Sequence, residues 1–225
     1  MEAKQEVRER VWQTLKDEGA ARFPGARGRI PNFRGAEGAA ERLAELSEWQ
    51  AAAVVKSNPD APQLPVRRRA RHDGKTLYMA VPRLTDEKPF VRVEGDPTIK
   101  KALAQGSPAR VEDLGHVDLV VCGTVAVNRS GVRIGKGGGY SDLELGLLVE
   151  AGLVDDDTTI VTTVHPLQLV DQELSETEHD FRVDVIVTPD EVVRTGSRRR
   201  SPGIIWDHLD DETIDAIPVL AARRP

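Results

Sequence analysis

The 225-residue sequence predicts an α/β protein with a mostly parallel sheet between two layers of helices. Two observations support this prediction. Strand-like and helix-like segments alternate along the chain, which is typical of parallel sheets covered on both faces. The stretch from Val117 to Val127 is almost continuously apolar, as expected of a strand buried on both faces. We therefore expect a three-layer α/β/α sandwich, Rossmann-like in plan, with this stretch at the centre of its sheet.

The other elements follow from hydrophobic spacing and from turn residues. Helices are expected at 4–18, 36–47 and 143–151, the last ending at Gly152, and residues 22–35 predict a loop because they are rich in glycine and proline. Besides 117–127, strands are expected at 51–56, 76–81, 158–164 and 183–188. We assign residues 1–197 to one α/β domain and residues 198–225 to a polar C-terminal tail.

Composition limits the classes of function. The net charge of −6 argues against a general nucleic-acid binder, although Arg67–Arg71 is a basic cluster. We interpret that cluster as a solvated turn, with contact to RNA or to a polyglutamate tail as the alternative. No apolar run reaches the roughly 18 residues that a membrane span needs. The single cysteine, Cys122, fits a buried strand position and a reducing cytoplasm, so we expect a cytoplasmic protein. Oligomeric state is not predicted.

The segment Arg133-Ile-Gly-Lys-Gly-Gly-Gly-Tyr140 carries the clearest functional signal. Adjacent glycines leave the backbone bare, so several N–H groups can turn toward one anion. Lys136 and Arg133 add cations suited to phosphate oxygens, and a helix starting near Tyr140 or Ser141 would add its positive end. The spacing matches neither the P-loop nor the dinucleotide-binding pattern. A flexible turn is the alternative, but we favour a site for a nucleoside triphosphate.

Two aspartates are candidate magnesium ligands. Asp142 lies just beyond the glycine loop, where it would either hold Mg²⁺ against the phosphates or cap the helix. Asp180, with His179 and Asp184, precedes an expected strand and would either face the ligand crevice or lie solvated at the surface.

The segment from Arg133 to Asp142 resembles the signature of the 5-formyltetrahydrofolate cyclo-ligase family, also called methenyltetrahydrofolate synthetases. The resemblance extends to Lys4–Arg8, Asp118–Gly123 and His179–Asp184. Further stretches resemble the methenyltetrahydrofolate synthase domain-containing branch of the family; these are 29–33, 55–67 and 75–78.

The resemblance implies a three-layer α/β/α fold and an ATP-dependent ligase that closes 5-formyltetrahydrofolate to 5,10-methenyltetrahydrofolate in one-carbon metabolism. It implies that the ATP phosphates are held by Lys4, Arg8, Arg133, Gly135, Lys136, Gly137, Gly138, Gly139 and Tyr140, and Mg²⁺ by Asp142 and Asp180. Arg133 and Lys136 would also neutralise the transferring phosphoryl group, with a reduced folate as partner.

The sequence departs from the family pattern at three places. Asp60–Gln63 stands where glutamate-containing residues usually help to hold the folate, Val125–Asn128 replaces an aromatic-plus-aspartate pair, and Ser141 replaces a tyrosine. These departures keep two alternatives open. One is a non-catalytic nucleotide-binding or regulatory homologue, and the other is an ATP-dependent enzyme acting on a different formyl or acyl compound.

Overall fold

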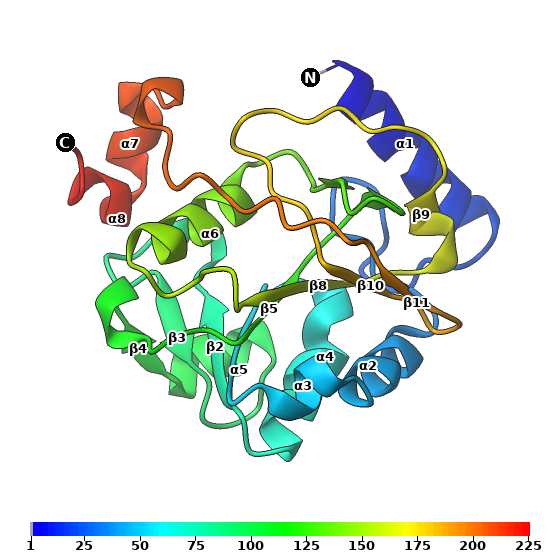
Figure 1. Cartoon of the computed structure of the whole chain (residues 1–225), viewed down its shortest axis with the longest axis horizontal. Coiled ribbons are helices and arrows are strands. Elements are labelled where there is room, and N and C mark those ends of the chain that lie inside the picture. The colour runs from blue at the N-terminus through cyan, green and yellow to red at the C-terminus, as the bar shows by residue number, and fades with distance from the viewer. Residues whose placement is uncertain (1) are drawn as a thin grey trace.

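A computed structural model describes residues 2–225 and contains one large sheet of eight strands. The strand order is β11-β10-β8-β5-β1-β2-β3-β4. Neighbours from β10 to β2 pair in parallel, whereas the strands at the two edges pair antiparallel (Figure 1). The strands span Val54–Ser57 (β1), Thr76–Ala80 (β2), Phe90–Arg92 (β3), Ser107–Ala109 (β4), Leu119–Cys122 (β5), Thr159–Thr163 (β8), Val185–Val187 (β10) and Val192–Arg194 (β11). The expected mostly parallel sheet is confirmed.

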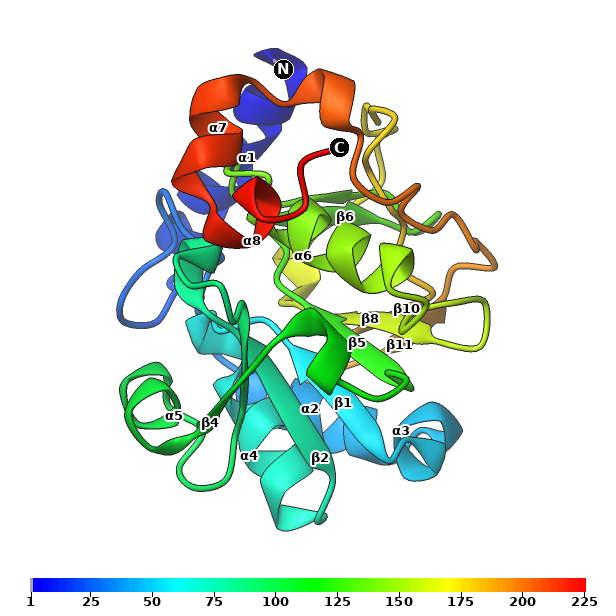
Figure 2. The same cartoon turned by 90° about the vertical axis from the view of Figure 1, so that its left-hand side faces the viewer.

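Helices cover both faces of this sheet. In Figures 1 and 2, α2, α3 and α4 lie on one side and α6 lies on the other, which confirms the three-layer prediction. Each face buries its own apolar cluster, one against α2 and α4 and the other against α6. The helices span Glu2–Asp17 (α1), Ala36–Ala44 (α2), Ser47–Ala51 (α3), Leu64–His72 (α4), Ile99–Gln105 (α5), Tyr140–Glu150 (α6), Asp211–Ala216 (α7) and Pro218–Ala221 (α8).

The predicted strand at 117–127 is in fact two strands in two sheets. Its first part is β5, an inner strand of the large sheet, as expected. Its second part is β6 (Ala126–Asn128), which pairs with β7 (Arg133–Ile134) and β9 (Leu169–Val170) in a small sheet beside α1. Both parts are apolar because both are buried, β5 in the clusters on the two faces of the large sheet and Ala126 of β6 in the cluster beside α1. The apolar run thus indicated burial correctly but not continuity.

Gly123 lies where the chain leaves the large sheet. A Cβ atom there would lie 2.8 Å from Asp60 Oδ2 and 3.0 Å from Ile30 Cγ1, so no other residue fits without displacing a neighbour. The chain therefore passes against the segments that contain Asp60 and Ile30.

The basic cluster at 67–71 is not a solvated turn, because it lies within α4. Arg67 is 1% exposed and donates hydrogen bonds to the backbone oxygens of Asn58, Asp60 and Pro97. Burial lowers the pKa of Arg67 to about 10, opposed by the charge of Asp60. The other arginines of the cluster, Arg68, Arg69 and Arg71, are partly or fully exposed. The buried arginine therefore stabilises the turn after β1 through hydrogen bonds to its backbone.

Residues 198–225 bury more apolar side chains in the core than the predicted polar tail would. The buried cluster beside α6 includes Ile204, Ile214, Ile217, Val219 and Leu220. The last three lie in or next to the short helix α8, which Figure 1 shows in red with α7. This segment therefore packs on the same layer as α6, whereas the boundary at residue 197 stays a prediction.

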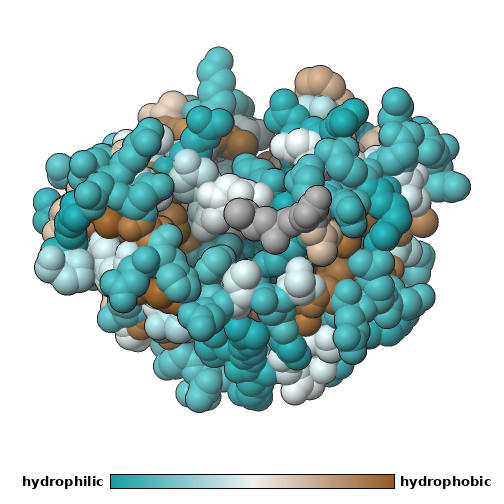
Figure 3. Space-filling view, turned by 90° about the horizontal axis from the view of Figure 1, so that it is seen from above, coloured by the Kyte–Doolittle hydropathy of each residue, from teal (hydrophilic) through white to brown (hydrophobic). Residues whose placement is uncertain are grey.

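The face of the molecule drawn in Figure 3 is predominantly hydrophilic. In the view of Figure 3, hydrophobic residues form scattered patches between larger hydrophilic areas. Within residues 2–225, no helix combines the length and the apolar character that crossing a bilayer requires.

We predict that Leu220→Ala will lower the free energy of unfolding by about 2–5 kcal/mol, the usual cost of truncating a leucine in a packed core. Leu220 is 0% exposed, so its removal leaves a cavity. Urea unfolding followed by circular dichroism measures the change. Arg224→Ala is the control, because its exposed pair with Asp211 should contribute about 1 kcal/mol or less. A loss for Leu220→Ala as small as that of the control would show that this segment does not belong to the core.

Candidate active site

The glycine loop connects β7 to α6. Gly137 and Gly139 adopt the left-handed region, with φ of 106° and 69°, where only glycine is unstrained. Gly139 precedes α6 and supplies no side chain to cap it, so the first N–H groups of the helix are left for another acceptor. The ring of Tyr140 covers Gly138, where a Cβ would lie 3.1 Å from the ring. The loop thus presents bare backbone and a helix amino end together, an arrangement that suits an anion.

Two cations of α1 reach this region. Lys4 and Arg8 are four residues apart and therefore share one face of the helix. Arg8 Nε donates to the backbone oxygen of Gly135 at 2.7 Å, and a Cβ on Gly137 would lie 3.4 Å from Arg8 Cζ. Lys4 Nζ lies 2.5 Å from a carboxylate oxygen of Asp180. The structure therefore brings together α1, the glycine loop and the segment of Asp180, which are far apart in sequence.

Arg133 is the buried cation at the centre of the site. Its guanidinium lies 3.1 Å from Asp142 Oδ1 and stacks on Phe181, with Cζ 4.3 Å from the ring centre. Nη1 donates to the backbone oxygen of Gly123 at 3.4 Å, while Nε is buried without a hydrogen-bond partner. A buried donor that lacks a partner is costly, and a bound anion would satisfy it.

The structure places Asp142 and Asp180 beside these cations. Asp142 lies in the first turn of α6 but does not cap it, because the N-cap residue is Gly139; the capping alternative is therefore wrong. Burial raises the pKa of Asp142, opposed by Arg133, and the charge of Asp180 raises it further. Asp180 is 9% exposed, which excludes the surface alternative. Although burial acts to raise it, the hydrogen bonds donated by Lys4 and Thr177 bring the pKa of Asp180 below its ordinary value.

Both aspartates fit a magnesium ion that arrives with a phosphate. Mg²⁺ is usually held by one or two carboxylates and completes its shell with water and phosphate oxygens. The charge of Asp180 acts to raise the pKa of Asp142, so the two carboxylates influence each other electrostatically. Each is now neutralised by a cation, Arg133 or Lys4, which a divalent ion would replace.

Lys136 lies next to Asp60, which belongs to the segment after β1. Its ammonium nitrogen is 3.8 Å from Asp60 Oδ1, and its side chain is half exposed. Burial raises the pKa of Asp60, and the charges of Lys136, Arg67 and Lys56 oppose that rise. Nothing in the sequence predicted this pair, because the two residues are remote in the chain. Lys136 therefore joins the glycine loop to the segment 58–63 after β1, which forms a second wall of the site.

That second wall holds an unsatisfied polar side chain. Gln63 ends the short 3-10 helix Ala61–Gln63 and is fully buried, yet neither its amide nitrogen nor its amide oxygen has a hydrogen-bond partner. Asn128 behaves differently. Its side-chain oxygen accepts from the backbone N–H of Val132 and from Ser130 Oγ, which closes the turn between β6 and β7. These two departures from the family pattern thus differ, since the Gln63 amide has no hydrogen-bond partner and the Asn128 side chain is committed to the fold.

Sequence reasoning also missed a buried ion pair behind the site. Lys56, on β1, lies 2.5 Å from Glu144, on α6, and both side chains are almost fully buried. A charged residue in each segment was visible in the sequence, but only the packing of α6 on the sheet pairs them.

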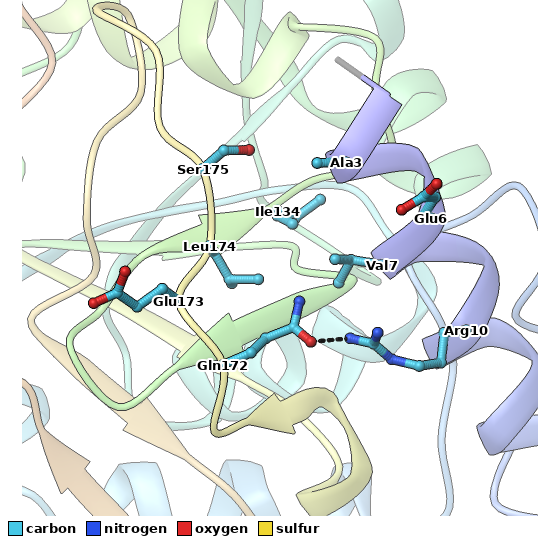
Figure 4. Close-up of a pocket in the computed structure, with 9 residues that line it drawn as sticks. All are labelled: Ala3, Glu6, Val7, Arg10, Ile134, Gln172, Glu173, Leu174 and Ser175. Carbon is cyan, nitrogen blue, oxygen red and sulfur yellow. Dashed lines mark hydrogen bonds between the residues drawn. The ribbon is translucent and has the colours of Figure 1, made fainter.

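A separate small cavity of about 120 Å³ lies along a neighbouring face of α1 (Figure 4). Figure 4 shows Val7, Ile134 and Leu174 converging on it, with Glu6 and Glu173 at its sides. Carboxylates at the rim of a cavity oppose a phosphate. This cavity is therefore distinct from the predicted nucleotide site, which involves the face of α1 that carries Lys4 and Arg8.

Comparison with known proteins gives a consistent result. The family model described as the 5-formyltetrahydrofolate cyclo-ligase family matches residues 1–189. The methenyltetrahydrofolate synthase domain-containing proteins of Bos taurus and Mus musculus are 39% and 40% identical, each over 99% of this chain. The chain spans 62% and 63% of the length of those two relatives.

The NMR structure of Aquifex aeolicus 5,10-methenyltetrahydrofolate synthetase superposes with a TM-score of 0.57 at 20% identity, covering 92% of this chain and 99% of that one. At this identity, the likeness establishes the shared fold.

The depressed pKa of Asp180 predicts a specific dependence of stability on pH. Above the ordinary aspartate pKa of about 3.9, the ionised carboxylate should stabilise the fold, and this contribution should be lost as pH falls through the lower folded-state pKa. Asp180→Asn should therefore unfold more easily at neutral pH, by about 1.5–3 kcal/mol for hydrogen bonds to a charged group. The difference from the unsubstituted protein should disappear in strong acid.

Urea unfolding at a series of pH values from neutral to strongly acidic measures this difference. Asp156→Asn, at an exposed position, is the control. A penalty for Asp180→Asn that stays constant down to the lowest pH would contradict the interpretation.

Proposed function

The chain belongs to the 5-formyltetrahydrofolate cyclo-ligase family, and we propose that it is an ATP-dependent ligase that closes 5-formyltetrahydrofolate to 5,10-methenyltetrahydrofolate. The observation that carries the proposal is the convergence of Arg8, Arg133 and two aspartates on a bare glycine loop. Such an enzyme would serve one-carbon metabolism in the cytoplasm, where its single buried cysteine, Cys122, would stay a thiol.

The nucleotide half of the proposed site offers backbone donors and cations that suit a triphosphate. The N–H groups from Gly135 to Tyr140 would cradle the phosphates, and Arg8 and Lys4 would approach them from α1. Arg133 would supply charge-assisted hydrogen bonds, including one from its unpaired Nε. Asp142 and Asp180 would hold Mg²⁺, which would balance the phosphate charge.

The reaction needs positioning and charge neutralisation more than a side-chain nucleophile. The formyl oxygen of the substrate would attack the terminal phosphate of ATP and release ADP. The neighbouring amine nitrogen would then attack the former formyl carbon and displace phosphate. Arg133 is held rigidly by Asp142 and Phe181, so its charge is already in place where negative charge develops. Lys136 would contribute from the opposite wall, after leaving Asp60 for the phosphate.

The folate half rests on Asp60 and Gln63. A buried amide with both atoms unpaired is suited to a ligand that offers a donor and an acceptor side by side, as the pyrimidine edge of a reduced folate does. An amide in place of a carboxylate would nevertheless change the charge that the substrate meets. This keeps the second candidate function open, which is ATP-dependent activation of a different formyl or acyl compound.

We predict that Lys136→Ala will weaken Mg-ATP binding by about 1.5–3 kcal/mol, the usual worth of a charge-assisted contact, which corresponds to roughly 10- to 100-fold. Isothermal titration calorimetry measures the affinity. Lys16→Ala, at an exposed position of α1, is the matched control and should bind as the unsubstituted protein does. Equal affinity in both variants would remove Lys136 from the phosphate site.

We further predict that the purified protein forms 5,10-methenyltetrahydrofolate, followed by its absorbance, and that Asp142→Asn lowers turnover on the order of 10²-fold or more. That is the usual effect of removing one electrostatic element from a preorganised site. Asp157→Asn, in an exposed loop, should leave turnover unchanged. Tight ATP binding without product from any reduced folate would instead support the non-catalytic homologue.

A further inference from the structure

Lys56 and Glu144 form a buried ion pair at the back of the site. Lys56 Nζ lies 2.5 Å from Glu144 Oε2, and the side chains are 1% and 5% exposed. Asn58 completes the cluster, because its side-chain oxygen accepts from Lys56 at 3.3 Å and its amide nitrogen donates to Glu144 at 3.3 Å. The same nitrogen lies 3.4 Å from Ser141 Oγ. These four residues join the carboxyl end of β1 to the first two turns of α6.

Stability alone does not account for this pair. Burial raises the pKa of Glu144, opposed by the charge of Lys56, so removal from water works against the ionised form. Transferring two charges into a protein interior costs several kcal/mol each, and well-packed apolar residues of similar volume are often equally or more stabilising. Removing one partner alone is strongly destabilising, because the other charge is left unpaired. What an ion pair adds is a fixed direction and distance between the two segments that it joins.

The two joined segments carry opposite halves of the site. Asn58 lies two residues before Asp60, and Arg67 binds the backbone oxygens of both. Ser141 adjoins Asp142, whose carboxylate pairs with Arg133. The segment 58–63 thus lies against the first turns of α6 through the cluster formed by Lys56, Asn58, Ser141 and Glu144. The exposed contact between Lys136 and Asp60 is the other link between the two walls.

We propose that Lys56 and Glu144 are positioning residues that set the distance between the folate-side segment 58–63 and the nucleotide-side turn 140–144. Both side chains have their partners within the cluster, so neither is needed to bind a reactant. The consequence for turnover rests on the proposed function, because the reacting groups of two bound molecules must meet in line. A displacement of about 1 Å in such an arrangement can cost on the order of 10²-fold in rate. The coupling of the two segments does not depend on the reaction.

The test replaces the pair with apolar residues of similar size, Lys56→Met/Glu144→Leu. We expect the urea midpoint to be retained or raised and the KM for ATP to change less than threefold, whereas kcat falls roughly 10- to 100-fold. Backbone amides in 58–63 and 140–144 should exchange hydrogen at least about tenfold faster, with the inner strands of the sheet unchanged. If the apolar pair does not fold, Lys56→Gln/Glu144→Gln, which keeps a neutral hydrogen-bonding pair, takes its place with the same expectations.

Val120→Ala is the control for destabilisation, because Val120 is buried on β5 in the same cluster as α6 but makes no polar link. Val120→Ala should lower the urea midpoint but keep the kcat of the unsubstituted protein. Unchanged kcat and unchanged exchange in the paired variant would overturn the proposal. If the unsubstituted protein makes no product, the proposed function fails, and the exchange rates still decide whether the pair positions the two segments.

Discussion

The buried charge of Arg133 is the constraint on which the site depends. A guanidinium removed from water must be neutralised and hydrogen-bonded, so its partners have to be brought to it. Asp142 from α6, the carbonyl of Gly123 at the end of β5 and the ring of Phe181 meet around it. These groups come from the large sheet, the helix layer and the loop before β10. One buried cation therefore holds together the segments around the glycine loop. Its Nε–H remains buried without a hydrogen-bond partner.

The same principle extends to the rest of the polar interior. Lys4 is paired with Asp180, Lys136 with Asp60, and Lys56 with Glu144, so each cation is matched by a carboxylate from a distant segment. The site is preformed in this neutralised state. A polyphosphate with a divalent ion would exchange partners within it, with phosphate taking the cations and the metal taking the aspartates. Such an exchange would give Arg133, Lys4 and the two aspartates near them new partners of opposite charge.

The change of direction at Gly123 creates the space in which these pairs meet. Because β5 stops there and the chain continues into the small sheet, the glycine loop projects from β7 beside the end of the large sheet, not from β5 directly. The absence of a side chain at Gly123 admits Asp60 and Ile30 against the backbone. α1 then packs on the small sheet, through the apolar cluster that includes Val7, Val11 and Ile134, and so carries Lys4 and Arg8 to the loop. The small sheet thus positions both α1 and the glycine loop, which carry the predicted nucleotide-binding residues.

The sequence by itself determined the layers, the central strand and the glycine loop, because these depend on local spacing. Apolar periodicity distinguishes helices from strands, and adjacent glycines mark bare backbone wherever they lie. It also singled out Asp142 and Asp180 beside the loop, through resemblance to the family. The tertiary structure alone decided that residues 117–127 are two strands, since burial in two different sheets leaves the same apolar pattern.

Tertiary structure alone also decided which charges meet. Arg67 belongs to a cluster that the sequence predicted to be solvated, yet it is buried, where it donates to two backbone oxygens of the turn after β1 and to the backbone oxygen of Pro97. The pairing of Lys56 with Glu144 and of Lys136 with Asp60 has no local signature. A charge in the sequence shows only its sign, whereas its partner is fixed by the packing of one layer on another.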